Sequence, residues 1–453
     1  MVIANRLPVR RVGRGKDVRW ERSPGGLVTA LEPVLHDYPG LWIGWDGSVG
    51  RAPEPFVHES LTIRPIALSG AAIDNFYHGF SNRTLWPLYH DAIRSPEFHR
   101  KWWDPYVQVN RRFARAAARV ARKGDLVWVQ DYHLQLVPGM LRETRPDLRV
   151  GFFLHIPFPP EELFAWLPWR AAILQGLLGA DVVGFQTDAS AQNFSRAARR
   201  WTDADGTDTE LQFRGRRIEV NSFPISIDFA DFDRAGDDPE VLAHAREIRR
   251  RLGSHRRVLL AVDRLDYTKG IDTRLQVLED LFRRGELSVE DVVLVQIAVP
   301  SRESVEEYRD MRILVEQTVG RVNGEYSEPG RVAVHYFRRS LARPELAAYY
   351  RAADVMLVTP LRDGMNLVAK EFVAARTDNS GVLVLSEFAG AASELRRAIL
   401  VNPRDVDGFG SSVLQALRMP RKESRQRMAV LRMQVRRHDV YDWARNFLGA
   451  LRG

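Results

Sequence analysis

The stretch RVLLAVDRLDYTKG, residues 257–270, decides the fold. Its first six residues, 257–262, are almost continuously apolar, which is typical of a strand buried on both faces in a parallel sheet. Similar runs recur at 126–130, 150–156, 182–186, 292–299, 332–337, 355–360 and 382–386. Helical patterns separate them, at 160–178, 188–200, 239–252, 303–321, 366–376 and 410–419. This alternation predicts an α/β protein with doubly wound sheets.

The alternation is interrupted in the middle of the chain. Residues 202–217 are polar, 218–227 resemble a short strand, and 228–238 form an acidic segment. We therefore expect three parts, namely a Rossmann-like domain over 1–230, a second over 231–435, and a C-terminal helix over 436–453 that packs back on the first domain. Ligands of open α/β sheets bind outside the carboxyl ends of the strands. Two such domains facing each other would place a site in the cleft between them.

Composition excludes several classes of protein. A chain of 453 residues with 45% hydrophobic and 27% charged residues is neither disordered nor fibrous. Its longest apolar run, 292–300, is too short to span a membrane, and the start of the chain does not resemble a signal peptide. The absence of cysteine excludes disulfides, thiolate catalysis and cysteine zinc sites. We expect a cytoplasmic protein without membrane contact.

The net charge of +8 invites the interpretation of a nucleic-acid-binding protein. Only six of the 66 basic residues are lysines, and the arginines are spread over every predicted helix, which favours coding bias over binding. No helix-turn-helix, zinc or RNA-binding signature accompanies the charge. We therefore expect no nucleic-acid partner and consider small anionic ligands more compatible with the chain.

The loop after the strand 257–262 carries two cations, Arg264 and Lys269. A short loop with two permanent positive charges at a strand end suits a diphosphate, because it neutralises the charge of a departing phosphate. The alternative is a surface loop in which these cations pair with Asp263 and Asp266.

A second motif, VTPLRDGMNLVAKEFVAAR, occupies residues 358–376. Gly364 allows a tight turn before the helix, Asp363 is suited to sugar hydroxyls, and Glu371 is suited to the two hydroxyls of a ribose. The start of the helix offers backbone amides to an anion, those of Met365, Asn366, Leu367 and Val368. The alternative is an ordinary capped helix with Asp363 near its N-terminus.

No metal site is expected. Acidic D-x-D triplets, which bind divalent ions in some nucleotide-sugar enzymes, occur at 203–205, 231–233 and 405–407. All three are predicted in polar loops away from the strand ends that carry the other motifs. We interpret them as solvated loops.

Ten motifs, the two above included, occur in an order that resembles one family. The others are NRLP (5–8), SPGGL (23–27), LWIGWDG (41–47), FSNRTLWPLYH (80–90), VQDYHLQLVP (129–138), GFFLHIPFP (151–159), GFQT (184–187) and VPSRESVEEY (299–308). Over nearly the whole chain they resemble the trehalose-6-phosphate synthases, retaining glycosyltransferases of the GT-B fold. The resemblance implies transfer of glucose from a sugar nucleotide, usually UDP-glucose, to glucose 6-phosphate.

The resemblance also implies roles on the donor side. Arg264 and Lys269 would hold the diphosphate, Asp363 and the amides after it the glucose and phosphate, and Glu371 the ribose. Three more residues match donor-side positions of the family, namely Gly26 for close approach to the phosphate, His155 facing the donor sugar, and Asp131 in the cleft.

On the acceptor side, the residues that match the family are Arg6, Tyr77, Trp86, Tyr132 and Arg302. Without the resemblance, Tyr77 and Trp86 would be interpreted as core aromatics. Arginine suits a phosphate because its planar fork donates paired hydrogen bonds. We expect Arg302 to contact only the acceptor phosphate and Lys269 only the donor diphosphate.

Because no nucleophile stands out, the resemblance implies metal-free, front-face transfer. Three alternatives remain open, an acceptor such as glycerol 3-phosphate, a cyclitol phosphate acceptor, or a sugar-phosphate sensor without activity. The sequence does not decide between UDP-, GDP- and ADP-glucose, nor whether the protein is a homo-oligomer or how it is regulated. Only four residues precede NRLP, fewer than is usual in the family, which leaves the first strand uncertain.

Overall fold

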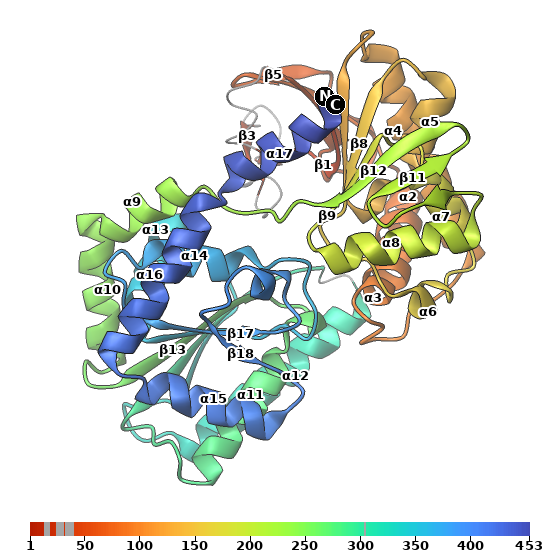
Figure 1. The fold of residues 1–453 in the computed structure, drawn as a ribbon. Helices are drawn as coiled ribbons and strands as arrows, with labels where there is room; N and C mark the ends of the chain where they lie inside the picture. Colours follow the sequence, from red (N-terminus) through yellow and green to blue (C-terminus); the bar gives the residue numbers. More distant parts are fainter. Residues whose placement is uncertain (13–18, 24–30, 32–39, 303–304) are drawn as a thin grey trace. The chain divides into compact units, whose positions relative to one another are not determined.

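The computed structural model describes residues 1–12, 19–23, 31, 40–302 and 305–453. The chain divides into two compact units (Figure 1). Unit 1 comprises Met1–Ile225 together with Val440–Gly453, and unit 2 comprises Ser226–Asp439. None of the helices in these ranges is long and apolar enough to cross a membrane.

Unit 1 is built on a ten-stranded sheet in the order β10-β11-β12-β9-β8-β7-β1-β4-β6-β5. Its inner pairs, from β12 to β6, are parallel, and the outermost strands β5, β10 and β11 are antiparallel. The strands are β1 (Val2–Arg6), β4 (Gly40–Trp45), β5 (Phe56–His58), β6 (Leu61–Pro65), β7 (Leu126–Gln130), β8 (Arg149–Phe153), β9 (Val182–Phe185), β10 (Asp205–Gly206), β11 (Glu210–Phe213) and β12 (Arg216–Ser222). A separate hairpin pairs β2 (Val9–Val12) with β3 (Arg19–Arg22).

The helices of unit 1 include an unusual element, η2 (Ile73–Leu85), a π-helix. The others are α2 (Gly70–Ala72), α3 (Trp86–Tyr89), α4 (Arg100–Val120), η3 (Tyr132–Leu134), α5 (Val137–Thr144), α6 (Glu161–Phe164), α7 (Arg170–Leu177), α8 (Asp188–Trp201) and α17 (Val440–Arg452). The π-helix follows α2 directly and leads into α3, so this segment forms one continuous helical path with a wider middle turn.

Helix α17 completes the core of unit 1 although it lies at the far end of the chain. The Phe447 ring stacks on Trp128 of β7 at 4.7 Å between ring centroids. Two neighbouring strands make room for Phe447 with glycines, because a Cβ at Gly151 or Gly184 would lie 2.8 Å from its ring. Trp443 also contacts Trp128, at 5.0 Å. The sheet face formed by β7, β8 and β9 is therefore buried by α17.

Unit 2 contains a six-stranded, fully parallel sheet in the order β15-β14-β13-β16-β17-β18. The strands are β13 (Arg257–Arg264), β14 (Val292–Val299), β15 (Val334–Phe337), β16 (Val355–Val358), β17 (Val382–Ser386) and β18 (Ile399–Val401). Strands β13 to β15 are added in one direction and β16 to β18 in the other. The switch point of this doubly wound sheet lies between β13 and β16, where ligands of such sheets bind.

The helices of unit 2 are α9 (Phe229–Asp237), α10 (Pro239–Leu252), η4 (Tyr267–Lys269), α11 (Ile271–Arg283), α12 (Glu306–Tyr326), α13 (Arg343–Ala352), α14 (Leu367–Ala375), η5 (Gly390–Ser393), α15 (Val406–Arg418) and α16 (Arg421–Arg437). The predicted α/β class is confirmed by the two sheets and their helices.

Two local predictions differ from the structure. The acidic segment 228–238 contains helix α9, because Asp228 caps it by accepting from the Asp231 amide at 3.1 Å, and Phe229 and Phe232 are buried. The single helix expected over 160–178 is two helices, α6 and α7, interrupted around Pro168, which lacks an amide donor.

Candidate active site

The two predicted donor motifs meet at the switch point of unit 2. Lys269, at the end of η4 after β13, lies with Nζ 2.5 Å from Oδ2 of Asp363, which follows β16. The backbones also join, since the Leu361 amide donates to the Thr268 carbonyl at 2.8 Å. Gly270 has a φ of 63°, and a Cβ there would lie 2.6 Å from the Thr359 carbonyl oxygen. The two loops thus form one tightly joined surface.

A buried ion pair holds the base of this surface. Arg274 of α11 donates to Asp263 of β13 at 2.7 Å, and both side chains are 1% exposed. The same guanidinium donates to Gln296 of β14 at 2.7 Å and to Thr359 after β16 at 3.0 Å. One cation therefore bridges three adjacent strands just below the loops. The alternative interpretation of a surface loop in which the cations pair with Asp263 does not hold, because Asp263 is buried and pairs with Arg274.

Arg302 is oriented toward the donor loop. Its guanidinium lies 3.5 Å from the carboxylate of Asp266 and also donates to the Tyr308 hydroxyl, which in turn donates to Asp266 at 3.2 Å. Burial alone would raise the pKa of Asp266, but Arg302, Arg264 and Lys269 outweigh burial and hold that pKa below its usual value. Because one carboxylate interacts with all three cations, the expected separation of Arg302 from the donor residues is incomplete.

The segment 363–368 combines a turn with a helix start. Asn366 has a φ of 79° and caps α14 by accepting from the Ala369 amide at 3.4 Å, while its side-chain nitrogen donates to Asp363 at 3.0 Å. Within the described ranges, no backbone partner is recorded for the amides of Leu367 and Val368. Met365 is buried, and Gly364 packs against Gly390 so closely that a Cβ on Gly390 would clash with its carbonyl oxygen. The turn leaves two helix-start amides for an anion.

Glu371 lies further along α14 and already has one partner. The hydroxyl of Tyr350, from α13, donates to its carboxylate at 2.8 Å. Burial raises the pKa of Glu371, and the hydrogen bond from Tyr350 partly opposes that shift. The carboxylate is thus fixed in position with accepting capacity left for hydroxyl donors. Arg264, in contrast, has an exposed side chain at the end of β13.

In unit 1, several predicted residues follow strands at the point where the strand order reverses. Strands β1 and β7 are parallel neighbours, and Arg6 ends β1 while Asp131 follows β7. The exposed Arg6 lies over the Trp45 ring at 4.2 Å, and its guanidinium reaches Gly47, where a Cβ would clash with it. Asp131 has a φ of 71° and accepts from the His155 amide at 3.2 Å.

The His155 imidazole is held by neutral partners. Its Nε2 lies 2.8 Å from the side-chain oxygen of Gln130, so this nitrogen carries the proton and donates. The amide nitrogen of Gln186 faces Nδ1 at 3.5 Å. Burial lowers the pKa of His155 to about 3, so the ring is neutral at physiological pH. Such a ring orients and donates hydrogen bonds but carries no charge.

The predicted aromatic residues lie in one chain of ring contacts. Trp45, under Arg6, contacts Tyr77 at 5.9 Å, Tyr77 stacks on His133 at 5.8 Å, and the chain continues through Tyr132 to Trp86. Trp86 and Tyr132 are buried, whereas Tyr77 is half-buried. The Tyr132 hydroxyl donates to Asn82 in the π-helix at 3.0 Å. The structure therefore brings Arg6 and the three aromatics together in unit 1, while Arg302 belongs to unit 2.

Two predictions need separate mention. Gly26 lies outside the described residues. Of the D-x-D triplets, Asp231 pairs with Arg343 and Asp233 with Arg432, and Asp405 caps α15 by accepting from the Gly408 amide at 2.9 Å. Over 1–12, 19–23, 31, 40–302 and 305–453, no three histidine, aspartate or glutamate side chains gather as metal ligands would.

Sequence reasoning missed several supporting residues, of which Arg274, Tyr308, Tyr350, Asn82 and Gln130 make the contacts above. The sequence also did not predict the backbone conformation of three site residues. The φ angle is positive at Asp131 (71°), Arg302 (47°) and Asn366 (79°). Such conformations cost about 1–3 kcal/mol in residues other than glycine and concentrate at functional sites.

The chain matches the model of glycosyltransferase family 20 over residues 1–452. Among curated proteins, it is 54% identical to the trehalose-6-phosphate synthase of Mycolicibacterium smegmatis, over 100% of this chain and 92% of that protein. The trehalose-6-phosphate synthase of Mycobacterium avium is also 54% identical, over 100% and 94%.

Solved structures agree with these relatives. The UDP-forming α,α-trehalose-phosphate synthase of Burkholderia xenovorans in complex with glucose 6-phosphate superposes with a TM-score of 0.91 at 34% identity, covering 100% of this chain and 99% of that one. A trehalose-6-phosphate structure from E. coli bound with UDP-2-fluoro glucose gives 0.91 at 33% identity, covering 100% and 99%.

Proposed function

The chain belongs to glycosyltransferase family 20, and from that premise we propose that it transfers glucose from UDP-glucose to glucose 6-phosphate with retention, giving trehalose 6-phosphate and UDP. The fold is GT-B, with two Rossmann-like domains, as in the trehalose-phosphate synthases it resembles. The observation that carries the proposal is the match to named synthases over the whole chain at 54% identity. The local geometry of each unit supports it.

On the donor side, we assign the diphosphate to Lys269, Arg264 and the amides of Leu367 and Val368. The support is the position of Lys269, fixed 2.5 Å from Asp363 where the ends of two strands meet. A cation held there before the reaction stabilises the charge that grows on the departing phosphate, because no reorganisation is needed at that moment. Glu371, fixed by Tyr350, is assigned to the ribose hydroxyls, and Asp363 to the glucose.

On the acceptor side, we assign glucose 6-phosphate to Arg6, Tyr77, Trp86 and Tyr132 in unit 1 and to Arg302 in unit 2. The ring contacts from Trp45 to Trp86 support this assignment, because rings packed this way keep one shape as a sugar binds. Arg6 is the exposed cation of the group and is suited to the phosphate dianion. Trp86 and Tyr132 are buried, so we assign them to packing beneath the residues that contact the sugar.

We propose front-face transfer at the anomeric carbon. The acceptor hydroxyl forms the new C–O bond on the side from which the phosphate leaves, the C–O bond to the phosphate breaks, and the hydroxyl proton passes to a phosphate oxygen. His155 supports this step, since burial lowers its pKa to about 3 and makes the ring too weak a base to compete for that proton while it orients the sugar. Asp131, which accepts from the His155 amide, positions the ring.

We further propose that transfer needs no divalent metal and that the enzyme works in the cytoplasm. Lys269 and Arg264 supply the charge that a metal supplies in other nucleotide-sugar enzymes. We expect nucleotide release to continue unchanged in excess EDTA. Loss of activity in EDTA that magnesium or manganese restores would contradict this part of the proposal.

The proposed reaction is tested by a matrix of donors and acceptors. UDP-, GDP- and ADP-glucose are each combined with glucose 6-phosphate, glycerol 3-phosphate, an inositol phosphate or water, and nucleoside diphosphate release is measured. We expect release from UDP-glucose only with glucose 6-phosphate. Release that depends on another acceptor identifies a different enzyme of the same fold, and binding of sugar phosphate without release from any donor identifies a sensor.

A further inference from the structure

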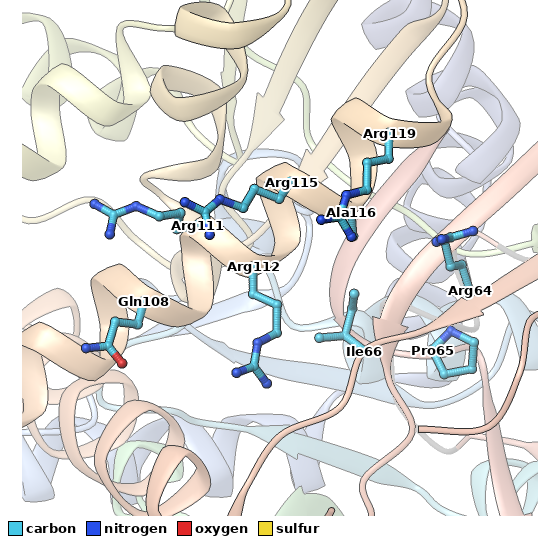
Figure 2. A pocket seen from close by; sticks show the side chains of 9 residues that line it. All are labelled: Arg64, Pro65, Ile66, Gln108, Arg111, Arg112, Arg115, Ala116 and Arg119. Atoms are coloured by element: carbon cyan, nitrogen blue, oxygen red, sulfur yellow. The ribbon is translucent and has the colours of Figure 1, made fainter. Parts of the chain in front are cut away.

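Unit 1 contains a cavity whose lining includes none of the residues assigned above. Figure 2 shows the cavity, which has a volume of about 490 Å³. One wall is helix α4 and the other is the end of β6 with the residues that follow it. The lining consists of five arginines together with one glutamine and three small or apolar residues, in full Arg64, Arg111, Arg112, Arg115, Arg119, Gln108, Pro65, Ile66 and Ala116.

These arginines differ from three consecutive arginines of helix α10. On α10, Arg249, Arg250 and Arg251 each pair with a carboxylate, of Asp354 or Glu247. The cavity contains no acidic residue, and within the described part of the chain none of its five arginines forms an ion pair. Only Arg112 has a recorded contact, to the Ala67 carbonyl.

The spacing along α4 makes this arrangement unfavourable without a ligand. Arg111, Arg115 and Arg119 recur at every fourth position, so they lie on one face of the helix. Like charges at this spacing destabilise a helix by about 0.2–0.5 kcal/mol per pair. A bound anion removes that repulsion. Coding bias alone would explain many arginines, but it would not explain why no acidic residue accompanies them among the described residues of the cavity.

We propose that this cavity binds a small organic anion carrying two or more phosphate groups. The arginine row extends over roughly 12 Å, given 1.5 Å per helical residue, which is more than a single phosphate occupies. The volume falls in the range of small-molecule sites, and Pro65, Ile66 and Ala116 offer apolar surface to the organic part of the ligand. Among the residues that the structure describes, none of those lining the cavity is aromatic, which disfavours single-stranded nucleic acid because such strands stack on aromatics.

The opposite face of α4 suggests a consequence of binding. Tyr106 donates to the Tyr132 carbonyl at 2.8 Å, and Asn110 donates to the His133 carbonyl at 3.0 Å and accepts from the Leu136 amide at 3.1 Å. The helix that carries the arginine row therefore also holds the backbone of the segment assigned to the acceptor. Binding itself can be measured without turnover, so its test is independent of the proposed function.

The experiment is calorimetric titration of inorganic triphosphate into the full chain at constant salt, in a Lys269→Ala background that weakens anion binding at the donor site. UDP is left out, because it carries two phosphate groups and would itself compete for the cavity. The test variant is Arg111→Gln/Arg115→Gln/Arg119→Gln, which keeps Arg112 and its contact to Ala67. The control is Lys422→Gln/Arg437→Gln, two exposed cations of α16. We expect one triphosphate per chain, an affinity at least about a hundredfold lower in the triple variant, and no change in the control.

Two outcomes overturn the proposal. The first is an unchanged triphosphate affinity in the triple variant. The second is binding of long-chain polyphosphate without binding of triphosphate, because that result indicates a surface for polymeric anions. The melting temperature without ligand checks the fold, and it should not fall because repulsion is removed. If the triple variant does not fold, Arg115→Gln alone replaces it and should weaken binding about tenfold. Equal affinity in that single variant and the Lys269→Ala parent would equally contradict the site.

Discussion

The donor-side segments of unit 2 and the acceptor-side segments of unit 1 are built in different ways. In unit 2, ion pairs join the loop after β13 to its neighbours, Lys269 with Asp363 after β16 and Arg302 after β14 with Asp266. They lie above the buried pair of Arg274 with Asp263. In unit 1, Arg6 is the only cation assigned to the site, and rings and neutral hydrogen bonds connect the other groups.

This difference predicts different sizes of mutational effect. Removing one partner of a buried ion pair leaves an uncompensated charge and costs about 3–5 kcal/mol, whereas a neutral hydrogen bond contributes about 0.5–1.5 kcal/mol. Substitutions that break an ion pair on the donor side should therefore have large effects that spread to neighbouring charges. Substitutions on the acceptor side should have small effects confined to one substrate.

The largest effect is expected for Lys269→Ala. The substitution removes the cation at the departing phosphate and leaves Asp363, whose side chain is 15% exposed, without that partner. We expect kcat/KM to fall at least about a hundredfold, measured as UDP release. Lys422→Ala, an exposed lysine on α16, is the control. A loss of less than tenfold would mean that ion pairing does not distinguish the donor side.

Arg302→Ala is expected to affect both substrates. We expect the KM for glucose 6-phosphate to rise by about 10- to 100-fold. Affinity for UDP should also fall, by about tenfold, because Asp266 loses a cation and then competes for Arg264 and Lys269.

The double variant Arg302→Ala/Asp266→Asn isolates this coupling. Removing the unpaired charge should restore UDP affinity, measured by calorimetry, while the KM for glucose 6-phosphate stays high. UDP affinity that is unchanged in Arg302→Ala would show that the two substrates are recognised separately after all.

His155 predicts a pH dependence of stability. Its pKa is about 3 in the folded protein and about 6.5 when unfolded, so below pH 6.5 the unfolded chain binds the extra proton. This contribution to the free energy of unfolding is full above pH 6.5 and is lost as pH falls, by about 1.4 kcal/mol per pH unit, a tenfold change in the folding equilibrium. His155→Asn should flatten urea-unfolding free energies between pH 6.5 and 5, whereas the exposed His244→Asn should not. Parallel slopes in His155→Asn and the wild type would contradict a ring that stays neutral in the folded protein.

Tyr132→Phe probes a neutral contact of the acceptor side. The variant loses the hydrogen bond to Asn82 in the π-helix. We expect the KM for glucose 6-phosphate to rise by about five- to tenfold and UDP affinity to stay the same. Tyr326→Phe, in unit 2, is a matched control. A change in UDP affinity would show that unit 1 also affects the donor.

The smallest effect is expected for Tyr350→Phe. Glu371 loses one donor but keeps its place on α14. We expect UDP affinity to fall about threefold. Tyr349→Phe, one residue earlier and without a recorded hydrogen bond, should bind UDP as the wild type does. A hundredfold loss would mean that Tyr350 itself contacts the nucleotide.

The same contrast explains what the sequence could predict. The strand before Asp263, the cations Arg264 and Lys269, and the helix after Asn366 follow from local pattern, because charge at a strand end and a helix start are local properties. The partner of each charge was not predictable. Lys269 pairs with Asp363 only when β13 and β16 become neighbours, and Arg274 reaches Asp263 only when α11 folds back on β13.

Unit 1 was less readable from pattern alone. Tyr77 and Trp86 look like core aromatics, and Trp86 is in fact buried, so only the family resemblance pointed to them. The π-helix and the positive φ of Asp131 also left no signal, because they depend on packing against segments distant in sequence. Helix α9 within the acidic segment 228–238 was not predicted, because its buried Phe229 and Phe232 stand out less than its charges.

The packing of helix α17 against strands β7, β8 and β9 has a consequence for folding during synthesis on the ribosome. Unit 2 is continuous in sequence, so it can complete its fold as soon as Asp439 has emerged. Synthesis of unit 1 begins first, but its fold is completed last. The surface around Trp128, Gly151 and Gly184 is covered only after Phe447 has been synthesised. At about 5–20 residues per second, the intervening unit takes roughly 10 to 45 s to make. During that interval an apolar sheet face of the nascent chain is exposed, and it is the part of this protein with the greatest need of a chaperone.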